Sequence, residues 1–241
     1  MSRLCNLVIA AMMSVVLATG AAMAGEGYRG FSFGVIGNAA DFTTVGSEKD
    51  LAPLSASTQD GELTGTTISK SVEFPSFFVE YSWGSGFGGM TVGIEHIPGT
   101  HTIGTKTRTD SDSAYSALDD DGTYTGKAEV DNLTTIYFEP ALMVNDSFGL
   151  YLKGGAAHMT VNTLESIAIG LTSSAYGNKD ILGGMYGIGV KGVTPWGLFV
   201  KLEATKTKFD AFSLESSTGN KNIIHAKPEI ESVRLALGYN F

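Results

Sequence analysis

Apolar and polar side chains alternate along eight separate stretches of the chain, and this pattern constrains the fold more than any other feature. Every second residue is apolar, as in a strand whose two faces meet different surroundings. The apolar sets are Phe31, Phe33 and Val35; Phe77, Val79, Tyr81 and Trp83; Met90, Val92 and Ile94; Ile136, Phe138 and Leu142; Phe148, Leu150 and Leu152; Tyr186, Ile188 and Val190; Leu198, Val200 and Leu202; and Val233, Leu235, Leu237, Tyr239 and Phe241. With flanking residues, each stretch reaches the roughly 9–11 positions that a tilted strand needs to cross a bilayer. No helical period of 3.6 residues extends over comparable lengths.

The charged residues of these stretches lie between the apolar positions. Four are acidic and four are basic, namely Glu80, Glu95, Glu139, Lys153, Lys191, Lys201, Glu203 and Arg234. A soluble sandwich would bury the apolar face and expose the charged one, so alternation alone does not decide which face lines the interior. In a membrane barrel the charges would share the lumen, where equal numbers of each sign allow pairing. An eight-stranded barrel has room for side chains but not for a wide channel, so we predict a polar plug, with a gate or narrow ion path as the alternative.

The connections between the stretches favour the barrel. Short turns at residues 84–88, 145–147 and 194–197 alternate with long segments that follow Asn38, Ile97, Val161 and Thr205. Bacterial barrels have short periplasmic turns and longer external loops, and an even strand number places both ends on one side. Both tryptophans, Trp83 and Trp196, fall at short turns, as an interfacial aromatic girdle would place them.

The sequence therefore predicts an all-β fold: a closed antiparallel transmembrane β-barrel of about eight strands, with short periplasmic turns and long extracellular loops. Leu63 to Ile68 and Leu164 to Leu171 also alternate, though weakly. We interpret them as extensions of strands beyond the membrane. Ten strands are the alternative.

The first 24 residues are typical of a cleaved signal peptide. Arg3 provides the positive charge, Leu7 to Leu17 is a short apolar run, and Ala22-Met23-Ala24 is an A-x-A cleavage site before Gly25. The predicted domains are thus a signal peptide at 1–24 and an outer-membrane barrel at 25–241. Cys5 is the sole cysteine, so its removal would leave a mature chain without disulfides or thiolate ligands.

Composition excludes several classes of function. The net charge is −9, and no basic stripe is available to neutralise phosphates, which argues against nucleic acid as a partner. After the leader no run of about 18 apolar residues occurs, so a helical membrane protein is excluded. No glycine-rich phosphate loop and no metal-ligand cluster stands out, and we expect neither cofactor nor metal.

The last strand carries the most specific motif. Val233, Leu235, Leu237, Tyr239 and Phe241 place apolar or aromatic residues at every second position and end the chain in phenylalanine. Together with the export signal and the alternation, this resembles the small outer-membrane barrels of Gram-negative bacteria, of the OmpA/OmpX and opacity-protein (porin-like) type. The resemblance implies that the barrel-assembly machinery reads this strand as an assembly signal. It also implies an outer-membrane monomer among outer-membrane lipids and lipopolysaccharide.

Enzyme chemistry finds little support in the sequence. Lipid-modifying barrels are the serious rival, but the close His and Ser of the lipid A deacylases are absent around His96 and His158, and no catalytic residue is assigned. Acidic residues at 110–112 and 119–121 have the right chemistry for calcium but not the spacing of a calcium loop. Lys106 and Arg108, nearby, are candidates for contact with lipid phosphates. We expect a structural or surface-interaction barrel, with a narrow channel for small solutes and a lipid-modifying enzyme as alternatives.

Overall fold

The computed structural model describes residues 29–49, 63–85, 88–110, 122–167, 176–217 and 223–241. The predicted signal peptide and most of both acidic segments lie outside these residues. The described part of the chain contains no helix that is long and apolar enough to span a membrane.

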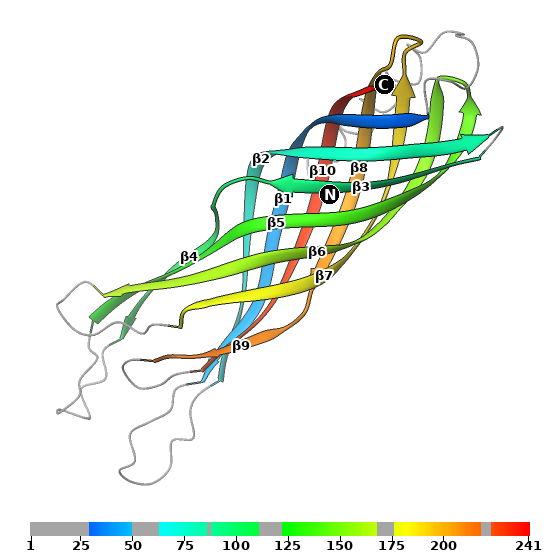
Figure 1. The fold of residues 1–241 in the computed structure, drawn as a ribbon. Coiled ribbons are helices and arrows are strands. Elements are labelled where there is room, and N and C mark those ends of the chain that lie inside the picture. Colours follow the sequence, from blue (N-terminus) through cyan, green and yellow to red (C-terminus); the bar gives the residue numbers. More distant parts are fainter. Residues whose placement is uncertain (1–28, 50–62, 86–87, 111–121, 168–175, 218–222) are drawn as a thin grey trace.

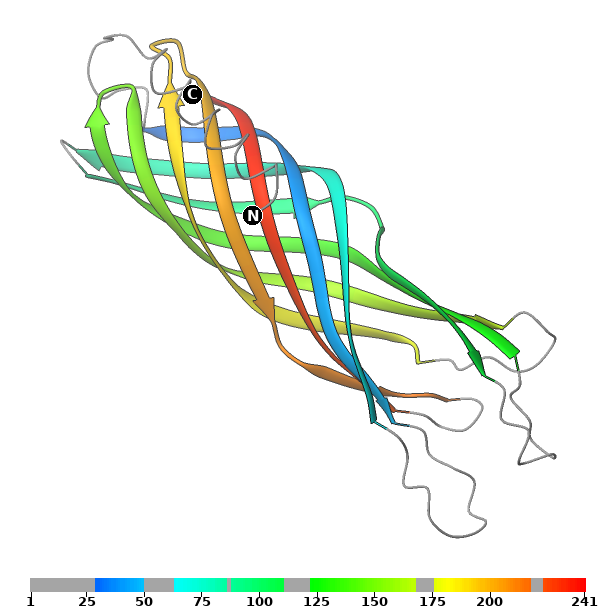
Figure 2. The same ribbon diagram turned by 180° about the vertical axis from the view of Figure 1, so that it is seen from behind.

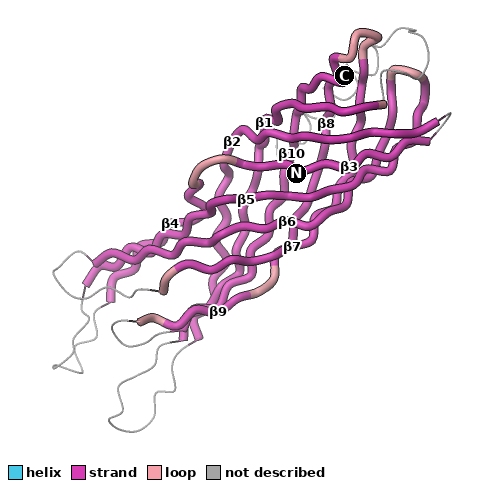
Figure 3. The backbone as a smooth tube through the Cα atoms, in the orientation of Figure 1, coloured by secondary structure: helices cyan, strands magenta, loops and turns pink. Residues whose placement is uncertain are grey.

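Eight of the strands in the described residues close into one antiparallel ring (Figure 1). In ring order they are β1 (Gly30–Lys49), β2 (Leu63–Ser85), β3 (Gly88–Ile97), β5 (Gly122–Asn145), β6 (Phe148–Ile167), β7 (Asn178–Val193), β8 (Leu198–Phe209) and β10 (Ile223–Asn240). Pairing of β1 with β10, from Ser32 opposite Asn240 to Lys49 opposite Ile223, closes the ring. The predicted fold class is confirmed, and Figure 3 shows that strands dominate the described backbone.

Two strands lie outside the ring, in segments that the sequence predicted as loops. β4 (His101–Asp110) pairs with β5, and β9 (Phe212–Glu215) pairs with β10. Every ring strand except β3, which has 10 residues, is also longer than predicted. Residues 63–68 are part of β2 and residues 164–167 part of β6, so both weakly alternating segments extend strands as expected; residues 168–171 lie outside the described part.

An apolar belt covers the outer surface of the ring, in the half that lies nearest the short turns. Phe33, Phe138 and Leu237 are typical, with about half of each side chain exposed (50%, 50% and 48%). These residues come from the sets that the alternation predicted. Phe148 and Leu202 are exceptions, because each is only 7% exposed. Leu202 lies between Val190 and Leu235 of the neighbouring strands, and Phe148 lies at the β5–β6 turn.

The alternation reverses its phase beyond this belt. In β2 the outward residues change from Phe77 to Glu73 and Ser71, while Phe74 and Val72 face inward. β1, β6 and β10 show the same reversal. Each strand is therefore apolar outside near the turns and apolar inside near the loops. The loop half is thus built like a soluble protein.

Hydrogen-bonded closure of the ring ends where the phase reverses. β2 pairs with β3 only from Phe77 onward, and β7 pairs with β8 only from Gly183 onward. Further out, the strands form two sheets, β2-β1-β10-β9 and β4-β5-β6-β7, which we call the outer sheets (Figure 2). A shared apolar core packs between them, including Phe42 and Ile230 from one sheet and Met159 from the other.

Candidate functional site

All eight charged residues singled out in the sequence lie buried inside the ring. Each has an exposed fraction of 4% or less, because its inward position in the strand alternates with the outward apolar positions. They come from seven of the eight ring strands: Glu80 from β2, Glu95 from β3, Glu139 from β5, Lys153 from β6, Lys191 from β7, Lys201 and Glu203 from β8, and Arg234 from β10.

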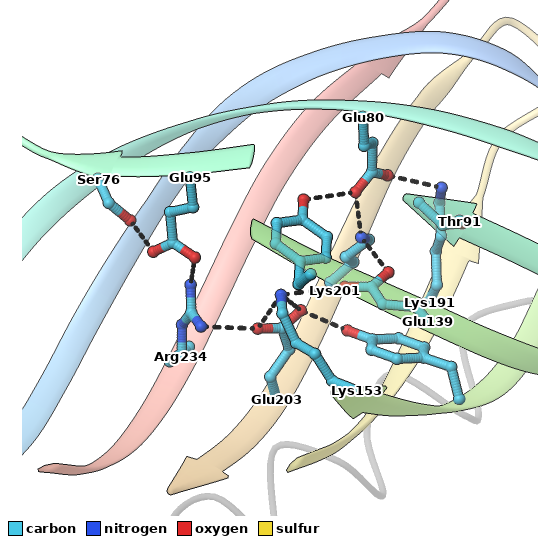
Figure 4. Close-up of polar contacts among 12 residues, drawn as sticks. Ser76, Glu80, Thr91, Glu95, Glu139, Lys153, Lys191, Lys201, Glu203 and Arg234 are labelled. Atoms are coloured by element: carbon cyan, nitrogen blue, oxygen red, sulfur yellow. Dashed lines mark hydrogen bonds and ion pairs between the residues drawn. The ribbon is translucent and has the colours of Figure 1, made fainter. Parts of the chain in front are cut away.

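These side chains form one continuous file in which the sign of the charge alternates (Figure 4). At one end, Lys191 Nζ lies 3.2 Å from Glu80 Oε1. Lys201 Nζ lies between two carboxylates, 2.5 Å from Glu80 Oε2 and 2.7 Å from Glu139 Oε2. Lys153 Nζ continues the file, 3.0 Å from Glu139 Oε1.

The other half of the file runs toward β10 and β3. Lys153 Nζ is also 3.0 Å from Glu203 Oε1, and Arg234 Nη1 is 3.4 Å from Glu203 Oε2. Arg234 Nη2 then donates to Glu95 Oε2. Every internal member of the file thus lies between two groups of opposite charge. That arrangement offsets the large desolvation cost of burying ions.

Neutral groups that the sequence did not single out complete the file. Ser76 Oγ donates to Glu95 at 2.6 Å, and Asn38 donates to Ser76 at 3.0 Å, which brings in β1, the remaining ring strand. Tyr137 and Tyr151 donate to Glu80 and Glu203 at 3.0 and 2.7 Å. Their inward parity could have identified them, because a polar group at a buried strand position needs a partner.

Two glycines provide space for the tyrosine rings. A Cβ added to Gly93 would lie 2.4 Å from the ring of Tyr137, and one added to Gly189 would lie 2.4 Å from that of Tyr151. Both glycines stand inward on neighbouring strands, so they allow close approach rather than an unusual backbone conformation. Each ring can therefore lie flat across the lumen and reach its glutamate.

Apolar side chains lie on both sides of the ionic file. Toward the turns, Phe199, Val193 and Phe78 belong to one buried cluster, and Lys191 Nζ lies 4.1 Å from the centre of the Phe199 ring. Toward the loops, the core between the outer sheets begins with Phe74 and Ala157. The charges are thus enclosed between two apolar layers, where their ion pairs are shielded from solvent.

The residues of the predicted assembly signal line the outside of β10. Leu235, Leu237, Tyr239 and Phe241 are exposed, and Val233 is half-buried. Phe241 donates its backbone N–H to Phe31 O, and its ring lies 5.6 Å from that of Phe33. The terminal phenylalanine therefore packs across the closure between the first and last strands.

One contact between a serine and a histidine was not predicted from the sequence. Ser213 of β9 and His225 of β10 are cross-strand neighbours 12 positions apart in the chain, and Ser213 Oγ lies 2.6 Å from His225 Nδ1. No ion pair to His225 is present among the described residues, so a triad-like acid is not part of this pair.

The remaining histidines do not converge on one site. His96 bonds Thr134 at 2.9 Å, and His158 Nε2 lies 3.9 Å from Asp180, both on the outside of the ring. No group of three or more potential metal ligands occurs within the described ranges. The acidic residues 111–112 and 119–121 lie outside those ranges.

A ring of eight antiparallel strands, apolar outside and ionic inside, defines a β-barrel of inverted polarity. Several solved structures are similar to this chain at low sequence identity. The attachment invasion locus protein Ail of Yersinia pestis, solved with the heparin analogue sucrose octasulfate, is 12% identical, with a TM-score of 0.35 and coverage of 88% of this chain and 99% of that one. The outer-membrane protease OmpT of Escherichia coli is 11% identical, with a TM-score of 0.42 and coverage of 88% and 97%.

The translocator domain of the autotransporter NalP from Neisseria meningitidis is 13% identical, with a TM-score of 0.36 and coverage of 98% of this chain and 97% of that one. No family model matches the chain. No curated protein matches it either.

Proposed function

We propose that this chain is an integral outer-membrane barrel of a Gram-negative bacterium, with a structural or surface-interaction role and a lumen sealed by charged side chains. The observation that carries the proposal is the inverted polarity of the turn half. Large apolar side chains such as Phe77 and Ile136 are exposed there, at 54% and 66%, while eight ionic groups are buried. In water, exposing the apolar side chains and burying the ionic ones would both cost free energy. Surrounding acyl chains would instead favour the exposed apolar face.

The sealed lumen is supported by the way in which the ionic file is held. Its members contact one another from opposite walls, and Lys201 of β8 bridges Glu80 of β2 and Glu139 of β5. A permeating ion would have to displace these pairs and also pass the apolar layers on either side. We therefore assign the file to plugging the barrel and fixing strand register.

The proposed location and barrel closure are tested on the chain extracted from membranes. A closed barrel resists SDS until it is boiled, so the unheated protein should migrate differently in a gel from the heated one. Cell fractionation with lipopolysaccharide as the marker should place it in outer membranes. Heat-insensitive migration, or recovery in the soluble fraction, would contradict the proposal.

Planar-bilayer recordings distinguish the sealed lumen from a narrow channel. We expect no reproducible single-channel steps from the intact chain. A variant that removes three internal charges, Lys153→Ala with Glu139→Ala and Lys201→Ala, should raise conductance if the barrel still folds. Regular steps from the unaltered protein would favour the channel instead.

A further inference from the structure

Ser213 and His225 form a hydroxyl–imidazole pair on the outward face of the loop half. They are partners in the register of β9 and β10, and Ser213 Oγ lies 2.6 Å from His225 Nδ1. The adjacent residues Phe212 and Ala226 stand on the opposite face, where they pack in the core between the outer sheets. His225 is also paired with Ser47 of β1. The pair is thus held by hydrogen-bonded strands on a packed core, while both of its side chains are exposed.

This pair supplies the two groups that nucleophilic catalysis needs. A serine hydroxyl alone is a weak nucleophile, and it is activated when a base within hydrogen-bonding distance accepts its proton. In the tautomer that carries its proton on Nε2, the imidazole of His225 accepts the hydrogen bond of Ser213 at Nδ1 and can take that proton. Because the strand pairing already holds the two atoms in contact, the pair is oriented before a substrate arrives.

Lys227 adds a positive charge beside the pair. It shares the outward face of β10 with His225, is exposed, and is the diagonal neighbour of Ser213 across the two strands. Diagonal neighbours are roughly 7–8 Å apart, which a long side chain can span. The ammonium of Lys227 can therefore approach the oxygen of a carbonyl group that Ser213 attacks. Negative charge develops on that oxygen, so a cation there favours the reaction.

Two further side chains define the surroundings of the pair. Glu215 is diagonal to His225 on the same face, and its negative charge favours the imidazolium that forms when His225 accepts a proton. Val45 of β1 lies opposite Lys227 and is 56% exposed, so it offers an apolar contact to a short acyl chain. Because the pair is exposed, water can reach it as the second reactant of a hydrolysis.

We propose that Ser213 and His225 hydrolyse short-chain carboxylic esters on the outward face of the outer sheets. Ser213 Oγ attacks the carbonyl carbon while its proton passes to His225 Nδ1. The bond to the alcohol oxygen then breaks, the departing alkoxide takes the proton from His225, and the acyl group remains on Ser213. Water attacks this acyl-serine with His225 again as the base, which releases the carboxylic acid and restores the hydroxyl. The ester and water are thus converted into an alcohol and an acid.

The test uses the full chain folded in detergent, a fluorophosphonate probe that reacts with activated serines, and p-nitrophenyl butyrate as the substrate. Mass spectrometry should place the probe on Ser213. Ser213→Ala should abolish the labelling, and both Ser213→Ala and His225→Gln should lower kcat/KM by at least about 100-fold. Lys227→Met should lower kcat by about tenfold with little change in KM, because the negative oxygen forms only during the reaction.

The matched control is Thr134→Ala, which removes a hydroxyl that lies 2.9 Å from His96 Nδ1 and should leave labelling and hydrolysis unchanged. A cross-strand hydrogen bond can also serve only to stabilise the strand pair. In that case the probe would not label Ser213, or the exposed imidazoles would hydrolyse the ester equally well in Ser213→Ala, and either result would overturn the proposal. Heat-modifiable migration of each variant shows that the barrel is folded, so a loss of labelling is distinguishable from a loss of the fold.

Discussion

Lys201 offers the sharpest test of the ionic file, because it lies between two carboxylates. Replacing it with methionine keeps most of the side-chain volume and removes the charge. Glu80 would keep Lys191 at 3.2 Å, and Glu139 would keep Lys153 at 3.0 Å. The lumen would nevertheless hold four carboxylates against three cations, in a place from which water is excluded.

Removing one partner from a buried ion pair costs about 3–5 kcal/mol. Since each carboxylate retains one lysine, we expect Lys201→Met to lower the free energy of unfolding by about 3 kcal/mol, the lower end of that range. Adding Glu139→Gln restores the charge balance, and Lys153 then keeps Glu203 at 3.0 Å. The double variant should regain about half of the loss, so the two changes are far from additive.

The measurement is unfolding by urea in lipid vesicles, followed by tryptophan emission from Trp83 and Trp196. Lys208→Met, on the exposed outward face of β8, is the matched control and should change stability by less than about 0.5 kcal/mol. A loss below about 1 kcal/mol for Lys201→Met would refute the argument. So would a double variant that is less stable than the single one.

Three further predictions concern the belt, the last strand and the outer boundary. Val200→Arg places a charge on the outward face of β8 and should cost about 2–4 kcal/mol if the side chain faces mid-bilayer, measured by the same unfolding assay; a negligible loss would mean that the face is misassigned. Deletion of Phe241 should slow membrane assembly in cells more than it weakens the folded barrel, and normal insertion would remove its role as an assembly signal. Beyond the belt, the hydrogen bond from Lys206 lowers the pKa of Glu229, so this pair contributes above the ordinary glutamate pKa and is lost as the pH falls through the lowered value. In Lys206→Met the carboxyl resonance of Glu229 should titrate at higher pH, and an unshifted curve would contradict the assignment.

The barrel and the positions of its charges follow from a local rule, which is why the sequence could predict them. A period of two fixes the face of every residue in a strand, so Glu80 and Lys153 had to share one side once Phe77 and Leu152 were placed on the other. Which charges pair could not be predicted. Lys201 meets Glu80 across the lumen, although the two are 121 residues apart in the chain. Tilt and register decide such contacts, and neither is visible in the alternation.

The strand lengths were underestimated for a different reason. A search for outward apolar residues ends where the phase of the alternation reverses. β2 continues through this point to Leu63, and β1 continues to Lys49. β4 and β9 were missed because their inward residues, such as Ile103 and Phe212, pack against a core formed by distant strands. Tertiary contacts, not local pattern, stabilise them.

The reversal of phase is itself the best marker of the membrane boundary. On the side of the short turns an outward polar residue would face acyl chains, and on the side of the loops an outward apolar residue would face water. The pattern must therefore change where the solvent changes. In β2 the change falls between Phe77 and Glu73, and in β10 between Val233 and Glu231. These two strands flank β1, where Ala39 pairs with both Glu73 and Val233. The boundaries of three neighbouring strands thus lie next to one another in the hydrogen-bonded register.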